Sequence, residues 1–261
     1  MRCYGSNRTT DPGVSLAKAT VLKRAKGLHI VRKALGFALF ALLVALVLFF
    51  GSGWWAYRAS QQVPDFYAVA IADAPALGTH AGDPFEQQVL ELRNEVRRPG
   101  TWQAVFTEEE INGWLTVDLP EKFPHALPAD VKEPRVAIVG ERVLVGCRYE
   151  GGSVSTVFSL EVEPHLTSDP NVVALRIRKA RAGALPIPLT QLIERTTKAA
   201  RRIDPAFRWE QIDGDPVALI TIPPDQSAAG NRRIKVTSLR VQDKTIVIAG
   251  ETEEQPPTTA R

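Results

Sequence analysis

The sequence predicts an α+β protein with an N-terminal transmembrane helix followed by an extracytoplasmic antiparallel sheet. The sheet is expected to be a meander with one long helix packed on it and two preceding helices. Three patterns predict this fold: a long apolar run near the N-terminus, two capped helical segments, and then short runs in which apolar and polar residues alternate. The expected parts are a basic tail (1–33), the span (34–57), a juxtamembrane segment with a helix (58–100), the α+β domain (101–251) and a disordered tail (252–261).

Residues 34–57 are predicted to form the transmembrane helix. The run contains no charged side chain, and its 24 residues cover the roughly 30 Å hydrocarbon core of a bilayer. A buried core helix would need a polar face, which this run lacks. A cleaved signal peptide is the closer alternative, but the preceding segment is long and no good small-x-small cleavage site follows, so an uncleaved signal anchor is favoured. The expected membrane-interface anchors are the flanking cations and distal aromatic residues Arg32, Lys33, Trp54, Trp55 and Tyr57.

Charge is divided unevenly between the two sides of this span. Residues 1–33 carry eight basic side chains and one acidic one, a net charge of +7, whereas residues 59–261 have a net charge of −5. Because cytoplasmic segments are enriched in Lys and Arg, the tail is predicted to be cytoplasmic and the domain to lie outside the cell (inner or cytoplasmic) membrane, in a bacterial envelope. The acidic domain gives no support for a nucleic-acid partner. Its Cys147 cannot pair with Cys3 across the membrane and is expected to be a core residue.

Helical patterns fill the segment between the span and the sheet. A short juxtamembrane helix is expected over Asp65–Ala74. The first of the two helices before the sheet is expected to start at Asp83, which is the predicted N-cap. Pro84 fits the first turn and Glu86 is placed to close a capping box, with Phe85 beginning an apolar stripe.

The second of these helices begins at a stronger signal, the capping box Thr107–Glu110. Its three consecutive acids diverge by about 100° per residue, so they are interpreted as cap and dipole residues rather than as a metal site. Asn112 lies inside this helix although Asn is a poor helix former, and is expected to satisfy a backbone group where the helix meets the sheet. The segment Leu119–Pro134 contains four prolines and is predicted to be a loop.

The period of the apolar residues then changes to two. Arg135–Val139 and Arg142–Tyr149 are predicted to form a hairpin across Gly140 and Glu141. Two further strands, with apolar alternation over Val154–Val162 and Val173–Ile177, are joined by the turn Asp169-Pro170-Asn171. These four runs indicate an antiparallel meander with one apolar face.

The rest of the chain is predicted to return once to helix before the last strands. Gly183–Pro188 leads into an amphipathic helix of about Leu189–Ile203, the long helix expected on the sheet. Strands are predicted over Val217–Ile222, Ile234–Val241 and Thr245–Gly250.

No motif in the sequence is specific for catalysis. There is no P-loop, no GxGxxG after a strand, no HExxH, no GxSxG and no CxxC, and the four histidines are scattered. We therefore assign no catalytic or cofactor-binding residue, no cofactor and no metal ligand, and do not expect an enzyme. A basic cluster has two open interpretations, a solvated strand face or a contact for lipid phosphates or an acidic envelope polymer. It consists of Arg176, Arg178, Lys179 and Arg181.

The order of these elements resembles the YpmS-like family of uncharacterised bacterial membrane-anchored proteins. The resemblance covers about residues 100–250 and is carried by Glu109-Glu110-Ile111-Asn112-Gly113-Trp114-Leu115, the meander, and Gly183-Ala184-Leu185-Pro186-Ile187-Pro188 before a helix. This chain departs from the family in a longer cytoplasmic tail and an added segment near residues 61–100. The resemblance implies a lipid-binding type of envelope fold, with a helix lying in a curved sheet, and carries over no catalytic residue.

Two functions are weighed on this basis. The first is binding of lipid or another amphiphile in an apolar groove, because a one-sided apolar sheet beside a bilayer can remain incompletely covered; ordinary core packing is the alternative for each residue. The second is a structural or assembly partner of other envelope proteins without a small ligand, with Trp102, Trp114 and Trp209 as anchors if they are exposed. The candidate groove residues are Val154, Phe158, Leu160, Val173, Leu175, Ile177, Leu189 and Ile193.

Overall fold

The computed structural model confirms an α+β chain with mostly antiparallel sheets and one long apolar helix at the N-terminus. It describes residues 40–73, 78, 80–152, 154–188, 208–222 and 232–254. The chain divides into two compact units, Met1–Ala56 and Tyr57–Arg261. The predicted helix Leu189–Ile203 and the anchors Arg32 and Lys33 lie outside the described residues.

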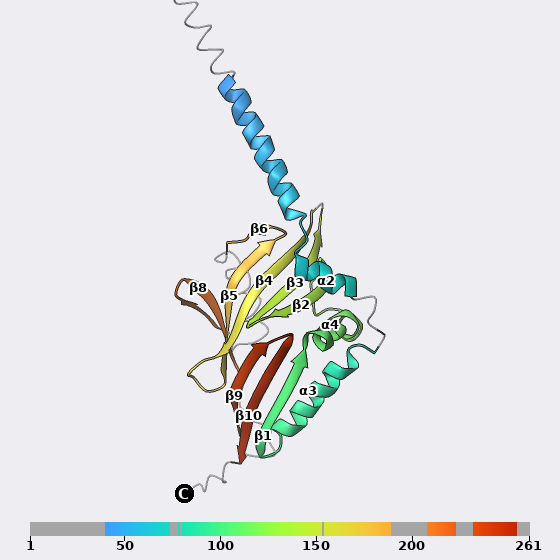
Figure 1. Cartoon of the computed structure of the whole chain (residues 1–261), viewed down its shortest axis with the longest axis vertical. Coiled ribbons are helices and arrows are strands. Elements are labelled where there is room, and N and C mark those ends of the chain that lie inside the picture. Colours follow the sequence, from blue (N-terminus) through green and yellow to red (C-terminus); the bar gives the residue numbers. More distant parts are fainter. Residues whose placement is uncertain are drawn as a thin grey trace, which may run out of the picture. The chain divides into compact units, whose positions relative to one another are not determined.

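The N-terminal helix is described from residue 40 and continues to residue 60, three residues beyond the predicted end of the span (Figure 1). The helical stretch Phe40–Asp73, interrupted at residues 61–64, is the candidate membrane span by length and composition, and its most apolar window is not buried by protein. Trp54, Trp55 and Tyr57 are all more than half exposed. Such an all-round apolar surface is stable as a helix where lipid replaces water.

Four short helices lie in the segments before the large sheet: α2 (Asp65–Asp73), α3 (Asp83–Val96), α4 (Glu108–Thr116) and α5 (Asp118–Lys122). The prediction of a capping box at the start of α3 is wrong. Its N-cap is Gly82, with no side-chain cap, because the Asp83 carboxylate lies 3.1 Å from His80 instead. Glu86 does not close the helix end either, since its carboxylate accepts hydrogen bonds from Trp114 at 3.2 Å and Lys122 at 2.6 Å. α5 also replaces part of the loop predicted from residue 119.

The capping box of α4 is confirmed, with Thr107 Oγ1 accepting from the Glu110 amide at 3.1 Å and Glu110 accepting from the Thr107 amide at 2.8 Å. The role expected for Asn112 is also confirmed. Its Nδ2 donates to the Val136 carbonyl at 2.8 Å, and its Oδ1 accepts from the Val136 amide at 2.9 Å. Glu108 accepts from the Ile138 amide at 2.6 Å. Together these side chains satisfy the free edge of strand β2, which would otherwise be open to pairing with another chain.

The large sheet has seven strands, of which six run in the order β2-β3-β4-β5-β8-β7, with β6 paired to β5. All the strand pairings among the described residues of this sheet are antiparallel, and β2 to β5 form the predicted meander with its hairpin at Gly140. The strands are β2 (Val131–Val139), β3 (Arg142–Gly151), β4 (Val154–Leu166), β5 (Val172–Ala182), β6 (Leu185–Pro186), β7 (Arg208–Ile212) and β8 (Asp215–Thr221).

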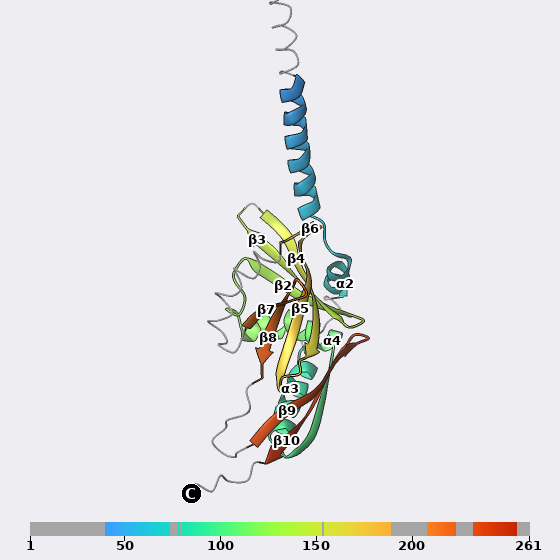
Figure 2. The same cartoon turned by 90° about the vertical axis from the view of Figure 1, so that its left-hand side faces the viewer.

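A second sheet of three strands corrects the expectation of a single sheet. It has the order β1-β10-β9, formed by β1 (Gly100–Thr107), β9 (Arg232–Gln242) and β10 (Thr245–Glu254). β1 was not predicted, and β10 runs on beyond Gly250. Helix α3 packs along β1, as Figures 1 and 2 both show, over a core of Trp102, Ile234 and Val236.

The start of the second unit is fixed to the corner of the large sheet. Thr156 Oγ1 donates to the Ser60 carbonyl at 2.6 Å, and the Ala184 amide donates to the Ala59 carbonyl at 2.9 Å. Gly183 has a φ of +59°, and a Cβ there would overlap with the Ser60 carbonyl oxygen. The close approach therefore requires glycine at this position.

Candidate functional site

Five of the predicted groove residues lie on one face of the large sheet. Antiparallel partners share a face, and in β4 and β5 the partners are Phe158 with Ala182, Leu160 with Ala180, Val162 with Ile177, Pro164 with Leu175, and Leu166 with Val173. A bulge at Arg178 accounts for the shift between the second and third pairs. Strand β4 thus contributes Phe158 and Leu160 to this face, and β5 contributes Val173, Leu175 and Ile177.

Neighbouring strands extend this apolar face. In β3, Val143, Val145 and Cys147 lie opposite Val162, Leu160 and Phe158. In β8, Ala218 and Ile220 lie opposite Leu175 and Val173. We call this set the apolar face, and its members among the described side chains are Val143, Val145, Cys147, Phe158, Leu160, Val162, Val173, Leu175, Ile177, Ala218 and Ile220.

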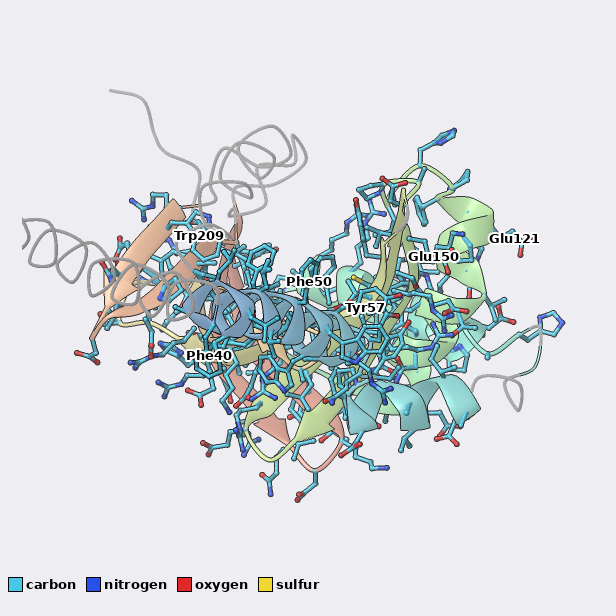
Figure 3. All side chains as sticks on the ribbon, turned by 90° about the horizontal axis from the view of Figure 1, so that it is seen from above. Phe40, Phe50, Tyr57, Glu121, Glu150 and Trp209 are labelled. Atoms are coloured by element: carbon cyan, nitrogen blue, oxygen red, sulfur yellow. The ribbon has the colours of Figure 1, made fainter. Side chains whose placement is uncertain are left out.

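The apolar face is only partly covered. Ile177 is buried, but Phe158, Leu160, Val173 and Leu175 all keep intermediate exposure. The Phe158 ring packs edge-on against Tyr149, with centroids 5.4 Å apart. Figure 3 places Trp209 and Glu150 at opposite ends of the sheet that carries this face. Burial raises the pKa of the Cys147 thiol, which makes it a poor nucleophile and fits the packing role expected for it.

The structure does not describe the side chains of the other three predicted groove residues. Leu189 and Ile193 lie outside the described residues, together with the helix that was expected to cover the sheet. Val154 is the first residue of β4, but its side chain is not among those described.

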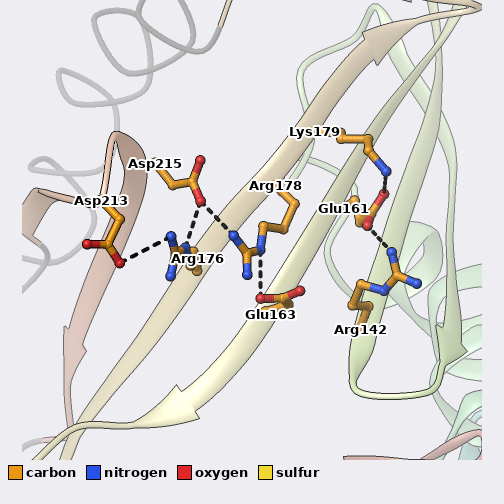
Figure 4. A network of polar contacts seen from close by, with 8 residues as sticks. All are labelled: Arg142, Glu161, Glu163, Arg176, Arg178, Lys179, Asp213 and Asp215. Atoms are coloured by element: carbon orange, nitrogen blue, oxygen red, sulfur yellow. Dashed lines mark hydrogen bonds and ion pairs between the residues drawn. The ribbon is translucent and has the colours of Figure 1, made fainter.

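The opposite face of the same strands carries a belt of ion pairs, drawn in Figure 4. Arg178 lies 2.7 Å from Glu163 and 2.7 Å from Asp215, and Arg176 lies 2.8 Å from Asp215 and 3.6 Å from Asp213. A second group joins Glu161 to Arg142 and, at 2.9 Å, to Lys179.

This belt bears on the basic cluster predicted from the sequence. Four acidic residues balance four basic ones, so three of the predicted cluster residues are neutralised within the sheet. The hydrogen bond from Arg176 lowers the pKa of Asp215, which keeps the carboxylate charged. Arg181 is exposed and has no ion pair among the described residues. Pairing within the sheet therefore accounts for three of the four cations, which together with their acidic partners carry no net positive charge.

The three tryptophans proposed as protein-binding anchors differ in how far they are exposed to solvent. Trp102 is 6% exposed and belongs to the core of the small sheet. Trp114 is half-buried between Phe85 and Phe123, with ring centroids 5.6 and 6.1 Å away. Trp209 is half-buried in β7. Trp102 is thus a core packing residue and not an exposed anchor. These three tryptophans form no exposed cluster.

Among the described residues no group of three His, Cys, Asp or Glu side chains is placed to hold a metal ion. The acidic run of α4 diverges as expected, since Glu110 caps the helix while Glu108 binds the edge of β2. No protein-family model, curated protein or solved structure matches the chain. The YpmS-like resemblance therefore stays a prediction.

Proposed function

We propose that this chain is a single-pass envelope protein whose outer domain binds a lipid or another amphiphile on the apolar face. The observation that carries the proposal is the partial exposure of Phe158, Leu160, Val173 and Leu175 on one continuous face, in a chain whose N-terminal helix is long and apolar enough to span a membrane. In the proposed arrangement the basic tail is cytoplasmic and the domain is extracytoplasmic, anchored in the inner membrane.

Physical chemistry favours an apolar ligand over water on this face. Covering exposed apolar surface gains about 25 cal/mol per Å², and each buried methylene of an acyl chain contributes about 0.8 kcal/mol. The face carries no charged side chain in its central strands, because the register places the charged residues of β4 and β5 on the other side of the sheet. The proposal assigns the chain a binding role without a catalytic residue, and membership of the YpmS-like family is part of it.

Site-specific photo-cross-linking tests this function in intact cells. The photoreactive residue benzoylphenylalanine replaces Phe158, which it resembles in shape, and after irradiation the cross-linked peptide is analysed by mass spectrometry. A matched control places the same residue at Val139, which is 51% exposed and has its backbone in the β2–β3 turn region away from the apolar face.

The proposal predicts an adduct with the mass of a lipid at position 158 and none at 139. An adduct with a peptide at position 158 would instead support the alternative, an assembly partner without a small ligand. No adduct, or equal lipid labelling at both positions, would contradict amphiphile binding on this face.

A further inference from the structure

A separate cavity of about 460 Å³ lies between helices α4 and α5, the proline-rich segment and the edge strand β2. Its volume is within the range of small-molecule sites. Apolar walls are contributed by Leu115, Leu119, Phe123, Leu127 and Val131, together with four prolines. Phe123 is 52% exposed, so one wall of the cavity borders solvent. None of the residues that line it belongs to the apolar face.

Two cations line this cavity: Lys132, which is paired with Glu150 at 2.6 Å, and Arg135, which is almost completely buried, with 4% exposure. The Arg135 Nη1 donates to the Pro134 carbonyl at 2.7 Å, but its Nε has no acceptor and it forms no ion pair with any described residue. Glu133 also lines the cavity, but its carboxylate is paired with Arg148 at 2.9 Å. Arginine keeps its charge under nearly all conditions, so the wall of the cavity contains a buried cation that forms no ion pair with a described residue.

The backbone places Arg135 there at a cost. The β2–β3 register shifts between Lys132 and Arg135, and Glu133 within this bulge has a φ of +50°. A non-glycine residue in the left-handed region has a strained backbone. Burying an unpaired charge is also unfavourable, unless a ligand supplies the opposite charge. Bulges that re-aim a side chain are frequent beside binding sites.

We propose that this cavity binds a small monocarboxylate with an apolar body, whose carboxylate accepts two hydrogen bonds from the Arg135 guanidinium while its hydrocarbon part lies against Leu119 and Phe123. The planar guanidinium matches a carboxylate in a bidentate pair. Because Lys132 is already paired with Glu150, the Arg135 guanidinium is left to balance one negative charge. A phosphate monoester carries about −1.5 to −2 near pH 7 and would bring uncompensated charge into the cavity. This site does not depend on amphiphile binding at the apolar face.

The probes are octanoate, octanol and octyl phosphate, titrated at pH 7 into the full chain in phosphatidylcholine nanodiscs and corrected with empty nanodiscs. Calorimetry is expected to show saturable octanoate binding. Octanol, which lacks the charge, is expected to bind at least about tenfold more weakly, because charge-assisted hydrogen bonds are roughly twice as strong as neutral ones. Octyl phosphate is expected to bind more weakly than octanoate.

Arg135→Met removes the charge but keeps an apolar side chain of similar length. It is expected to abolish the preference for octanoate over octanol, whereas the control Arg142→Met, which removes an arginine on the other side of the β2–β3 hairpin turn, leaves the preference intact. Octanoate binding equally well to both variants, no saturable binding to the wild type, or octyl phosphate binding as tightly as octanoate would each overturn the assignment.

The melting temperature of the ligand-free protein gives a second readout. It distinguishes an arginine that is kept for a ligand from one that only stabilises the fold. If Arg135 is kept for a ligand, Arg135→Met relieves an unpaired buried charge, so the melting temperature of the ligand-free variant stays equal to that of the wild type or rises. Octanoate should then raise the melting temperature of the wild type but not that of the variant. A variant that melts well below the wild type and still binds octanoate would show that Arg135 serves the fold alone.

Discussion

The hydrogen bonds of Asn112 make a sharp prediction about the edge of the large sheet. Asn112→Ala removes both bonds to the Val136 backbone, at 2.8 and 2.9 Å. A typical hydrogen bond contributes about 1 kcal/mol net, and a backbone group left unsatisfied in a partly buried place costs about 1–3 kcal/mol. The better helix propensity of Ala offsets this loss of unfolding free energy by about 0.5 kcal/mol. The expected loss in unfolding free energy is therefore about 2–4 kcal/mol.

Urea unfolding of the full chain in nanodiscs, followed by tryptophan fluorescence, measures this loss. Hydrogen exchange of peptides that contain Val136 provides a local check, because the amide that Asn112 now protects should exchange faster. The matched control is Asn94→Ala, the same substitution at an exposed position of α3, which should be neutral or slightly stabilising. If Asn112→Ala unfolds within about 0.5 kcal/mol of the wild type, the reasoning that α4 secures the edge of β2 is refuted.

Three further predictions concern single positions. Gly183→Ala should lower the unfolding free energy by at least about 1–3 kcal/mol, because the residue has a positive φ and its Cβ would overlap the Ser60 carbonyl; a melting temperature equal to the wild type would contradict this. Thr107→Ala should cost about 1 kcal/mol through loss of the α4 cap, measured in the same urea assay, and Thr107→Ser should restore most of it. Asp215 has a pKa below its ordinary 3.8 because Arg176 donates a hydrogen bond to it, so its stabilising contribution is present above pH 3.8 and is lost as the pH falls through the lower folded-state value. Asp215→Asn should therefore reduce the fall in melting temperature between pH 5 and pH 2, and an unchanged fall would count against the pairing.

The sequence was sufficient to predict those features of the fold that a few neighbouring residues determine. Thr107 and Glu110 form their capping box within a single turn, so four consecutive residues contain the whole interaction. The hairpin at Gly140 likewise follows from a glycine that adopts a positive φ between two alternating runs. Asn112 was recognised because a poor helix former in a helix needs a compensating partner, although the partner Val136 could not be named from the sequence.

The features that were missed depend on residues far apart in the chain. β1 pairs with β10, so Trp102 lies opposite Gly250, and nothing near residue 102 in the sequence indicates that partner. The capping box of α3 failed because Glu86 binds Trp114 and Lys122 of other helices. Tertiary contacts of this kind override local capping preferences.

The cavity at Arg135 was also not predicted from the sequence, in which Arg135 looks like an ordinary first residue of a strand. One signal was available: Pro134 directly precedes it, and proline in a strand marks an edge or a bulge. That signal locates the irregularity but says nothing about burial, because the walls come from α4, α5 and the proline-rich segment.

Native mass spectrometry of the full chain, released from nanodiscs made with a defined lipid mixture, tests the central claim most directly. The account predicts that one lipid or amphiphile stays bound to the wild type, is lost in Leu160→Glu on the apolar face, and is retained in the control Val139→Glu. A wild-type chain that carries no bound amphiphile, or a bound lipid that Leu160→Glu leaves unchanged, would contradict binding on the apolar face.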